Sequence, residues 1–220
     1  MNMQGAIFDM DGTLLDSMYV WETVGADYLR SRGVEPPAGL RETLRPMSLR
    51  QAAEHLRAAF GLTEPAEEIM RGVNERVAEG YRRRFVCKPY IPELLERLRR
   101  QGVRMCVATA TDRPLAEAAL QRNGILEYFS FLLTCTEVGV GKDSPLFFRK
   151  ALVQLGTDKP NTFVFEDALY ALQTAKADGF PVVGVYDPSA DGQRADILRL
   201  SDVYLPSYEP ACLQKAGLPV

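Results

Sequence analysis

Histidine and cysteine are scarce in this chain of 220 residues, and their scarcity excludes several kinds of active site. The only histidine, His55, lies in a stretch typical of a helix interior, and no Gly-x-Ser-x-Gly segment occurs, so a Ser-His-Asp hydrolase has no support. The absence of any Cys-x-x-Cys pair argues against a zinc knuckle or a disulfide framework. We expect the four cysteines to be small buried hydrophobic residues: Cys87, Cys106, Cys135 and Cys212.

Long apolar runs and an excess of positive charge are also missing. The net charge is −3, whereas a nucleic-acid surface needs a basic footprint. The longest apolar runs, such as 181–186, are far shorter than a membrane span, and the N-terminus lacks the charged and apolar regions of a signal peptide. We therefore expect a cytoplasmic protein without membrane or nucleic-acid partners. The sequence predicts no particular oligomeric state.

The rest of the composition, with 46% hydrophobic and 25% charged residues, is that of a globular protein with one large core or a core plus a smaller domain. From about residue 86, apolar strands alternate with helices that begin near a proline and end just before a glycine. The predicted helices span 92–101, 114–123 and 145–155, and the predicted strands span 103–108, 131–133, 162–165 and 182–186. This alternation predicts an α/β fold, a Rossmann-like parallel sheet covered by helices.

A further short strand ends at Phe8, about 80 residues before the next strand, and the interval has a helical pattern. Ile69, Val73, Val77 and Tyr81, for example, recur at every fourth position. We expect an inserted α-helical cap at 17–84, a catalytic core at 1–16 and 85–220, and hinges near 15–17 and 85–89.

Two carboxylates, Asp9 and Asp11, directly follow that first strand, before a turn at Gly12. Because they are two residues apart at a strand end, they should project into the same small space, where like charges resist joint ionisation unless a cation neutralises them. Mg2+ is the natural cation, since it prefers oxygen ligands and commonly combines carboxylates with a substrate phosphate.

Polar residues also follow the other predicted strands, and ligands of open parallel sheets bind at those ends. They are Thr109 with Ala110, then Lys142, then Glu166 with Asp167. Together these residues can hold a divalent ion and a phosphoryl group. Each also has a structural alternative: Thr109 as a strand end, Lys142 as a solvated loop charge, and the acidic pair as a helix cap.

In combination, these motifs resemble those of the haloacid dehalogenase superfamily, in the branch with a helical cap after the first strand that includes β-phosphoglucomutase-like enzymes. The resemblance covers Ile7 to about Asp187. It implies that Asp9 is the nucleophile and Asp11 the acid/base. It further implies phosphate binding by Thr109 and Lys142 with the N–H groups of Met10 and Ala110, and Mg2+ binding by the Asp9 side chain, the Asp11 carbonyl and Asp167, with Glu166 in support.

The implied activity is Mg2+-dependent hydrolysis of a small phosphate ester, of the sugar or polyol phosphate class, through an aspartyl-phosphate. A sugar phosphomutase shares these residues, but mutases of this branch place an arginine directly after a cap serine, where this chain has Ser48-Leu49-Arg50. A non-catalytic phosphate-binding module, the third alternative, should lack one of the two aspartates, and a dehalogenase should lack Asp11.

The chain departs from the family pattern at positions next to the implied catalytic and ligand-binding residues. Asp143 stands where relatives usually have proline, Leu146 where they have an acidic residue, and Ala168 and Ala171 where they often have serine and glycine. The sequence does not indicate a particular substrate. Three arginines of the predicted cap are candidates for binding an anionic substrate: Arg41, Arg45 and Arg50. The three consecutive arginines at 82–84 are instead expected to be exposed to solvent.

Overall fold

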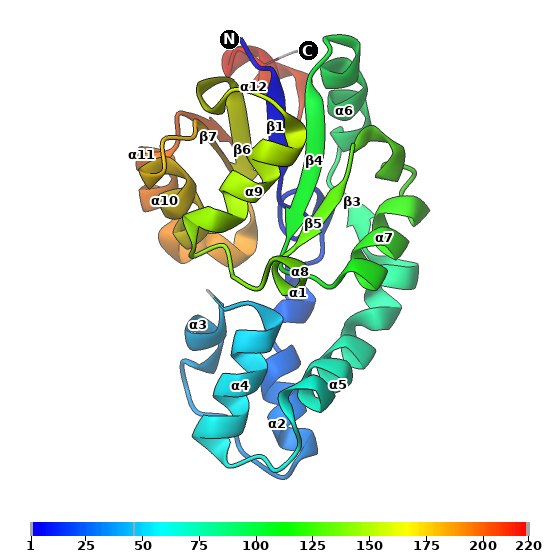
Figure 1. Ribbon diagram of the computed structural model, residues 1–220, viewed down its shortest axis with the longest axis vertical. Coiled ribbons are helices and arrows are strands. Elements are labelled where there is room, and N and C mark those ends of the chain that lie inside the picture. Colours follow the sequence, from blue (N-terminus) through cyan, green and yellow to red (C-terminus); the bar gives the residue numbers. More distant parts are fainter. Residues whose placement is uncertain (1, 46, 219–220) are drawn as a thin grey trace.

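A six-stranded parallel sheet forms the centre of the molecule. The computed structural model describes residues 2–45 and 47–218, and the strand order in the sheet is β5-β4-β1-β6-β7-β8. All pairings are parallel. The strands are β1 (Gly5–Phe8), β4 (Arg104–Thr109), β5 (Leu132–Thr134), β6 (Thr162–Glu166), β7 (Val182–Val185) and β8 (Val203–Leu205). The predicted α/β class with a Rossmann-like parallel sheet is therefore confirmed (Figure 1).

Helices pack on both faces of this sheet, because its central strands are apolar on both sides. Phe8 of β1 lies in one hydrophobic cluster with α6 (Ile91–Arg100), α7 (Arg113–Arg122) and α12 (Pro210–Lys215). Ile7 lies in a second cluster with α9 (Pro145–Leu155), α10 (Leu169–Ala177) and α11 (Arg194–Leu200). Successive residues of a strand thus bury opposite faces, as the pleat requires.

The predicted helices agree with α6, α7 and α9 to within one residue at each end. Pro145 begins α9, and Gly156 ends it with a φ of 64°, a left-handed conformation that glycine adopts without strain. The structure adds α10, α11, α12 and β8, which the sequence reading missed. These elements are short, and β8 has only three residues.

Between β1 and β4, a two-stranded antiparallel ribbon of β2 (Leu15–Asp16) and β3 (Val86–Cys87) brackets a helical segment. The helices are α1 (Met18–Trp21), α2 (Val24–Ser31), α3 (Leu40–Leu44), α4 (Leu49–Phe60), α5 (Ala66–Glu79) and a wide π-type turn, η1 (Gly80–Arg84). In Figure 1 they form a layer of their own beside the sheet. We propose that 17–84 is the cap and that the ribbon is its hinge.

Some smaller expectations are met only in part. Cys106 and Cys135 are buried as expected, whereas Cys87 and Cys212 are partly exposed; all four are free thiols. Trp21 and Tyr28 lie in different helices, because the chain turns between α1 and α2. His55 lies within α4. None of the helices in the described part of the chain is long and apolar enough to span a membrane.

Candidate active site

The strand ends converge on a cavity of about 480 Å³ between the sheet and the helical segment. Asp9 follows β1, Thr109 ends β4, and Glu166 ends β6. Lys142 comes from the loop between α8 (Cys135–Val138) and α9. The predicted site residues that line the cavity are Asp9, Asp11, Thr109, Ala110, Lys142, Glu166 and Asp167. The side chain of Met10 is fully buried in the core, so Met10 can offer only its main chain.

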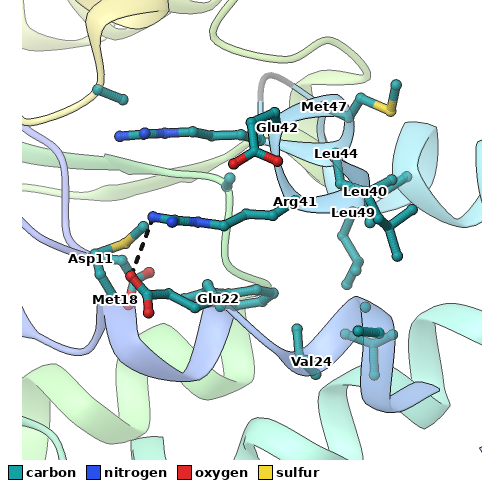
Figure 2. Close-up of a pocket in the computed structure, with 18 of the residues that line it drawn as sticks. Asp11, Met18, Glu22, Val24, Leu40, Arg41, Glu42, Leu44, Met47 and Leu49 are labelled. Carbon is teal, nitrogen blue, oxygen red and sulfur yellow. Dashed lines mark ion pairs between the residues drawn. The ribbon is translucent and has the colours of Figure 1, made fainter. Parts of the chain in front are cut away.

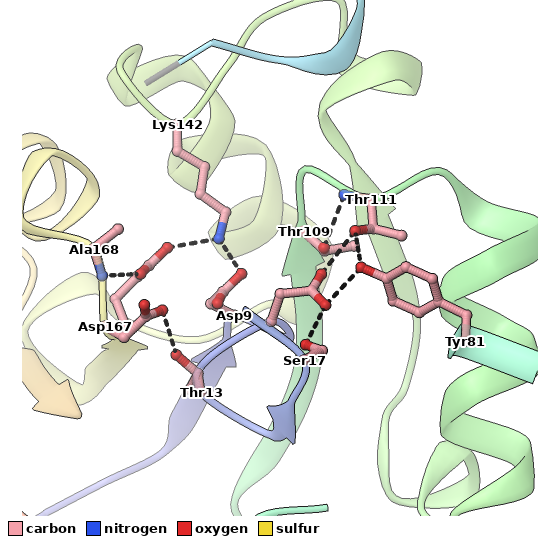
Figure 3. Close-up of polar contacts among 11 residues, drawn as sticks. Asp9, Thr13, Ser17, Tyr81, Thr109, Thr111, Lys142, Asp167 and Ala168 are labelled. Carbon is pink, nitrogen blue, oxygen red and sulfur yellow. Dashed lines mark hydrogen bonds and ion pairs between the residues drawn. The ribbon is translucent and has the colours of Figure 1, made fainter. Parts of the chain in front are cut away.

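Lys142 is buried between two carboxylates. Its ammonium group forms ion pairs with Asp9 and with Glu166, the latter at 2.6 Å from Nζ to Oε1 (Figure 3). Burial alone would lower the pKa of Lys142, but the charges of Asp9 and Glu166 together raise it well above its ordinary value. Lys142 is therefore a fixed cation, and the interpretation of a solvated loop charge is wrong.

Asp9, Glu166 and Asp167 form an acidic trio, with one oxygen of each lying within 4.8 Å of the other two. Burial and the neighbouring charge of Glu166 raise the pKa of Asp9 to about 7 and that of Asp167 well above its ordinary value. The Thr13 hydroxyl donates to Asp167 Oδ1 at 3.3 Å, while the buried Oδ2 has no hydrogen-bond partner.

A bound cation would neutralise the charges of these three carboxylates and would give the unpaired oxygen of Asp167 a partner. Clustered carboxylates with an unsatisfied buried oxygen are an all-oxygen donor set, which suits a hard ion such as Mg2+. The helix-cap alternative holds in part, for Glu166. Its carboxylate accepts a hydrogen bond at 2.7 Å from the N–H of Ala168, the N-cap residue of α10, which also braces the loop carrying Asp167.

Asp11 has a different environment from Asp9, although the two are only two residues apart. Its Oδ1 accepts hydrogen bonds from the Ser17 hydroxyl at 2.6 Å and the Tyr81 hydroxyl at 2.7 Å, and its Oδ2 accepts one from Thr111 at 2.7 Å. The expectation that both carboxylates share one metal space is thus corrected. Glu166, not the Asp11 carboxylate, completes the trio, and Asp11 can offer a metal only its carbonyl.

The hydrogen bonds around Asp11 are complete only if Asp11 is a carboxylic acid. Tyr81 also contacts Thr111 at 3.0 Å and accepts from the Trp21 indole at 2.6 Å, which makes five contacts among these side chains. The three hydroxyls and the indole supply one proton each, so one contact lacks a proton. With a proton on Asp11 Oδ2 the Thr111 contact reverses: Asp11 donates to Thr111, Thr111 donates to Tyr81, and all five contacts carry a proton. Burial raises the pKa of Asp11 even though the three hydroxyls lower it, which agrees with this count.

Sequence reasoning missed several of these residues. Ser17, Tyr81 and Thr111 meet at Asp11 from distant parts of the chain, and Figure 3 shows their side chains converging. In the sequence, Tyr81 is marked only as the last member of the predicted helix face that begins at Ile69, and Thr111 only as a second hydroxyl residue after Thr109. Lys88 was also missed: it pairs with Asp187 at 3.0 Å, and its charge partly opposes the rise in the pKa of Asp167 that burial and Glu166 cause.

The cap side of the cavity is mostly apolar. Leu40, Leu44 and Leu49 line it, as do Arg41 and Arg45. Figure 2 shows Arg41 extended toward Glu22, with 3.2 Å between Nη2 and Oε1. Of the three candidate arginines, Arg50 was wrong: it does not line the cavity.

Arg50 pairs instead with the exposed Glu67 at 2.8 Å. The arginine run at 82–84 is exposed, as expected.

Comparisons with known proteins agree with this geometry. A family model for haloacid dehalogenase-like hydrolases matches residues 3–179. The validoxylamine A 7'-phosphate phosphatase of Streptomyces hygroscopicus subsp. limoneus is 28% identical over 211 residues, which cover 94% of this chain and 98% of that protein. The phosphorylated carbohydrates phosphatase of Thermotoga maritima is 24% identical over 192 residues, 87% of this chain and 89% of that protein.

Among solved structures, a variant of CbbY from Rhodobacter sphaeroides in complex with xylulose 1,5-bisphosphate superimposes with a TM-score of 0.81. It is 22% identical, and the match covers 94% of this chain and 96% of that one, which confirms the fold. The family match spans most of the sequence and includes every strand end that contributes to the cavity. The chain therefore belongs to the haloacid dehalogenase-like hydrolases.

Proposed function

We propose that this protein is a Mg2+-dependent phosphatase of small phosphate monoesters, of the sugar or polyol phosphate class. The observation that carries the proposal is the placement of Asp9 in the lining of the cavity, where its carboxylate pairs with a buried lysine and has an oxygen within 4.8 Å of oxygens of two further carboxylates. The validoxylamine A 7'-phosphate phosphatase and the phosphorylated carbohydrates phosphatase among the relatives support the substrate class.

In the first step, an oxygen of Asp9 forms a bond to phosphorus as the bond from phosphorus to the ester oxygen breaks. One difficult displacement is thereby divided into two easier ones, with an aspartyl-phosphate between them. Lys142, the Thr109 hydroxyl and the N–H groups of Met10 and Ala110 balance the charge that develops on the phosphoryl oxygens.

Asp11 supplies the proton that the leaving oxygen needs. Its burial raises the pKa of Asp11 and so favours the protonated acid, although the hydroxyls that hold it oppose this shift. After the alcohol leaves, the Asp11 carboxylate accepts a proton from the water that attacks the aspartyl-phosphate. The acid is thereby restored and inorganic phosphate is released.

The Asp9 side chain, Asp167 and the Asp11 carbonyl would hold Mg2+, with Glu166 in support. When bound, the ion neutralises the phosphate and the acidic trio and thus lets nucleophile and substrate approach each other. The helical segment closes over the cavity, excludes bulk water and contacts the leaving group.

One observation favours hydrolysis over a phosphomutase. Ser48 caps α4 by accepting a hydrogen bond from the Gln51 N–H, and the next residue, Leu49, lines the cavity. The position expected to hold a mutase arginine therefore presents a leucine. A non-catalytic module is disfavoured because Asp9 and Asp11 are both present and positioned.

The test is phosphate release from a panel of sugar phosphates, polyol phosphates, phosphoglycolate and nucleotides, with Mg2+ and with EDTA. We expect turnover of at least one sugar or polyol phosphate, abolished by EDTA. With a hexose 1-phosphate, free phosphate and the 6-phosphate isomer are measured together. Isomer formation without matching phosphate release would identify a mutase, and no turnover on any ester would refute the proposal.

A further inference from the structure

Tyr81 lies at the centre of the hydrogen bonds that hold Asp11. Its hydroxyl is 2.7 Å from Asp11 Oδ1, 3.0 Å from the Thr111 hydroxyl and 2.6 Å from the Trp21 indole nitrogen. The Tyr81 side chain is completely buried, and Figure 3 shows it pointing from the helical segment toward Thr111 and Ser17. The phosphatase mechanism does not itself require this tyrosine.

The Trp21 indole fixes the direction in which Tyr81 donates. An indole N–H can only donate, so the Tyr81 oxygen must accept from Trp21. Its own proton is then directed at Asp11 or Thr111, both on the core side. Trp21 is the only tryptophan in the chain and comes from α1, at the opposite end of the inserted segment from Tyr81.

The backbone around Tyr81 is also unusual. It lies in the π-type turn η1, where the Phe85 N–H donates to the Gly80 carbonyl five residues earlier, at 2.9 Å. The Phe85 ring packs edge-on against the Tyr81 ring, with centroids 4.8 Å apart. Such wide turns often occur at functional sites, because they redirect a side chain that a regular helix would aim elsewhere.

We propose that Tyr81 is a positioning residue for the acid/base Asp11, and that Trp21 orients it. The proposal rests on the proposed phosphatase function. Trp21 and Tyr81 belong to the inserted helical segment, whereas Asp11 and Thr111 belong to the sheet side of the cavity. The acid is therefore assembled from both parts: Ser17 and Tyr81 of the helical segment hold its Oδ1, and Thr111 of the sheet side holds its Oδ2.

The test uses Tyr81→Phe, which keeps the ring and removes only the hydroxyl. The measured quantity is kcat/KM, which reports phosphoryl transfer to Asp9, on an alkyl phosphate and on p-nitrophenyl phosphate. An alkoxide needs a proton to leave, whereas nitrophenolate does not. We expect kcat/KM for the alkyl ester to fall by about 10- to 100-fold, part of what a general acid contributes, and that for the aryl ester to fall less than about threefold.

The matched control is Tyr28→Phe. The Tyr28 ring is also completely buried in the helical segment, and its hydroxyl contacts a carboxylate, Glu64 at 3.2 Å. Unlike Asp11, Glu64 does not line the cavity. Tyr28→Phe should leave the ratio of the alkyl-ester to aryl-ester kcat/KM values unchanged. Trp21→Phe should change that ratio in the same direction as Tyr81→Phe, by a smaller factor. Competitive inhibition by inorganic phosphate should be the same in Tyr81→Phe and wild type, because Lys142 and Thr109 are intact.

Equal losses on both esters in Tyr81→Phe, or the same change of ratio in Tyr28→Phe, would overturn the positioning role and leave the phosphatase function standing. Absence of phosphatase activity in the wild type would refute the proposed function and this inference together.

Discussion

At the scale of single residues, Asp9 and Asp11 differ in their chemical properties because the groups around them differ. Asp9 faces Lys142 and two carboxylates, whereas Asp11 faces hydroxyl groups. A carboxylate beside a fixed cation can remain ionised and attack, and a buried carboxyl surrounded by hydroxyls can hold a proton. Two identical side chains can thereby act as nucleophile and acid.

Substitution of each aspartate by asparagine should therefore have different consequences. Asp9→Asn should abolish turnover, because an amide is not a nucleophile. Asp11→Asn should still bind phosphate but lose about 100-fold or more in kcat on alkyl esters, because the acid is missing. Turnover and inhibition by inorganic phosphate are measured for both variants. An Asp9→Asn enzyme that kept most of its rate would show that another residue attacks.

Much of this could be predicted at the residue scale, but not all of it. The proposed nucleophile, acid, lysine and acidic pair are marked by their places after predicted strands, and the structure brings them together. Ser17 and Tyr81 carry no such mark, and Thr111 is marked only as a second hydroxyl after Thr109. Their meeting at Asp11 depends on how the inserted segment docks. The orientation of Asp11 away from the trio likewise follows from tertiary hydrogen bonds, which spacing does not encode.

At the scale of elements, the turn η1 joins the inserted segment to the sheet side. Gly80 packs directly against the Phe85 ring, so that an added Cβ would overlap it. The Phe85 carbonyl in turn accepts a hydrogen bond from the Asn123 side chain at 3.0 Å, which fixes the returning strand to the end of α7. The backbone of Gly80 is helical, with φ of −57°, a conformation that any residue can adopt. Glycine is therefore required here because there is no space for a side chain.

Gly80→Ala should destabilise the protein. Alanine gains up to about 1 kcal/mol in helix propensity over glycine, but overpacking costs about 1 to 3 kcal/mol, so the net effect is a loss. Because Tyr81 adjoins the displaced ring, activity on alkyl esters should fall as well. Thermal melting and kcat/KM are compared with Gly192→Ala, whose Cβ would meet nothing within 4 Å. An unchanged melting temperature in Gly80→Ala would contradict this account of the turn.

The elements themselves were largely predictable, because each signal was local. Proline and glycine mark α6, α7 and α9, and β-branched residues on both faces mark the buried strands. Hinges were predicted near 15–17 and 85–89, where β2 and β3 lie, but neither the pairing of these two strands nor the π-type turn was predicted. Both depend on pairing or packing between residues that are distant in sequence.

At the scale of the whole molecule, the acidic trio should make metal-free stability depend on pH. In the folded state the pKa of Asp9 is about 7, above its ordinary value of 3.8, because burial and Glu166 disfavour the charge. Between these values the folded state binds more protons than the unfolded state, so the free energy of unfolding should fall as pH rises from about 4 to about 7. Denaturant melts in EDTA check this. Stability that rose over the same range would contradict it.

Mg2+ should reverse that loss, and Asp167 should govern the effect. Because the ion binds the assembled site and not the unfolded chain, it should stabilise the protein by about 2.7 kcal/mol at one hundred times its dissociation constant. Asp167→Asn removes one ligand and one carboxyl group whose ionisation burial and Glu166 disfavour, so it should raise the melting temperature in EDTA and reduce the gain on adding Mg2+. Melting is followed across a Mg2+ titration at fixed ionic strength. Equal gains in both proteins would place the ion elsewhere.

The central claim is that Asp9 receives the phosphoryl group, and peptide mass spectrometry tests it most directly. Asp11→Asn, which should form the intermediate from an activated aryl phosphate but hydrolyse it slowly, is incubated with that substrate and Mg2+, then quenched in acid and digested. The account predicts one added phosphoryl group on the peptide that contains Asp9. That label should be absent in EDTA and absent in the Asp9→Asn, Asp11→Asn double variant. Substrate turnover with the label on another peptide, or a label that persists without Asp9, would contradict it.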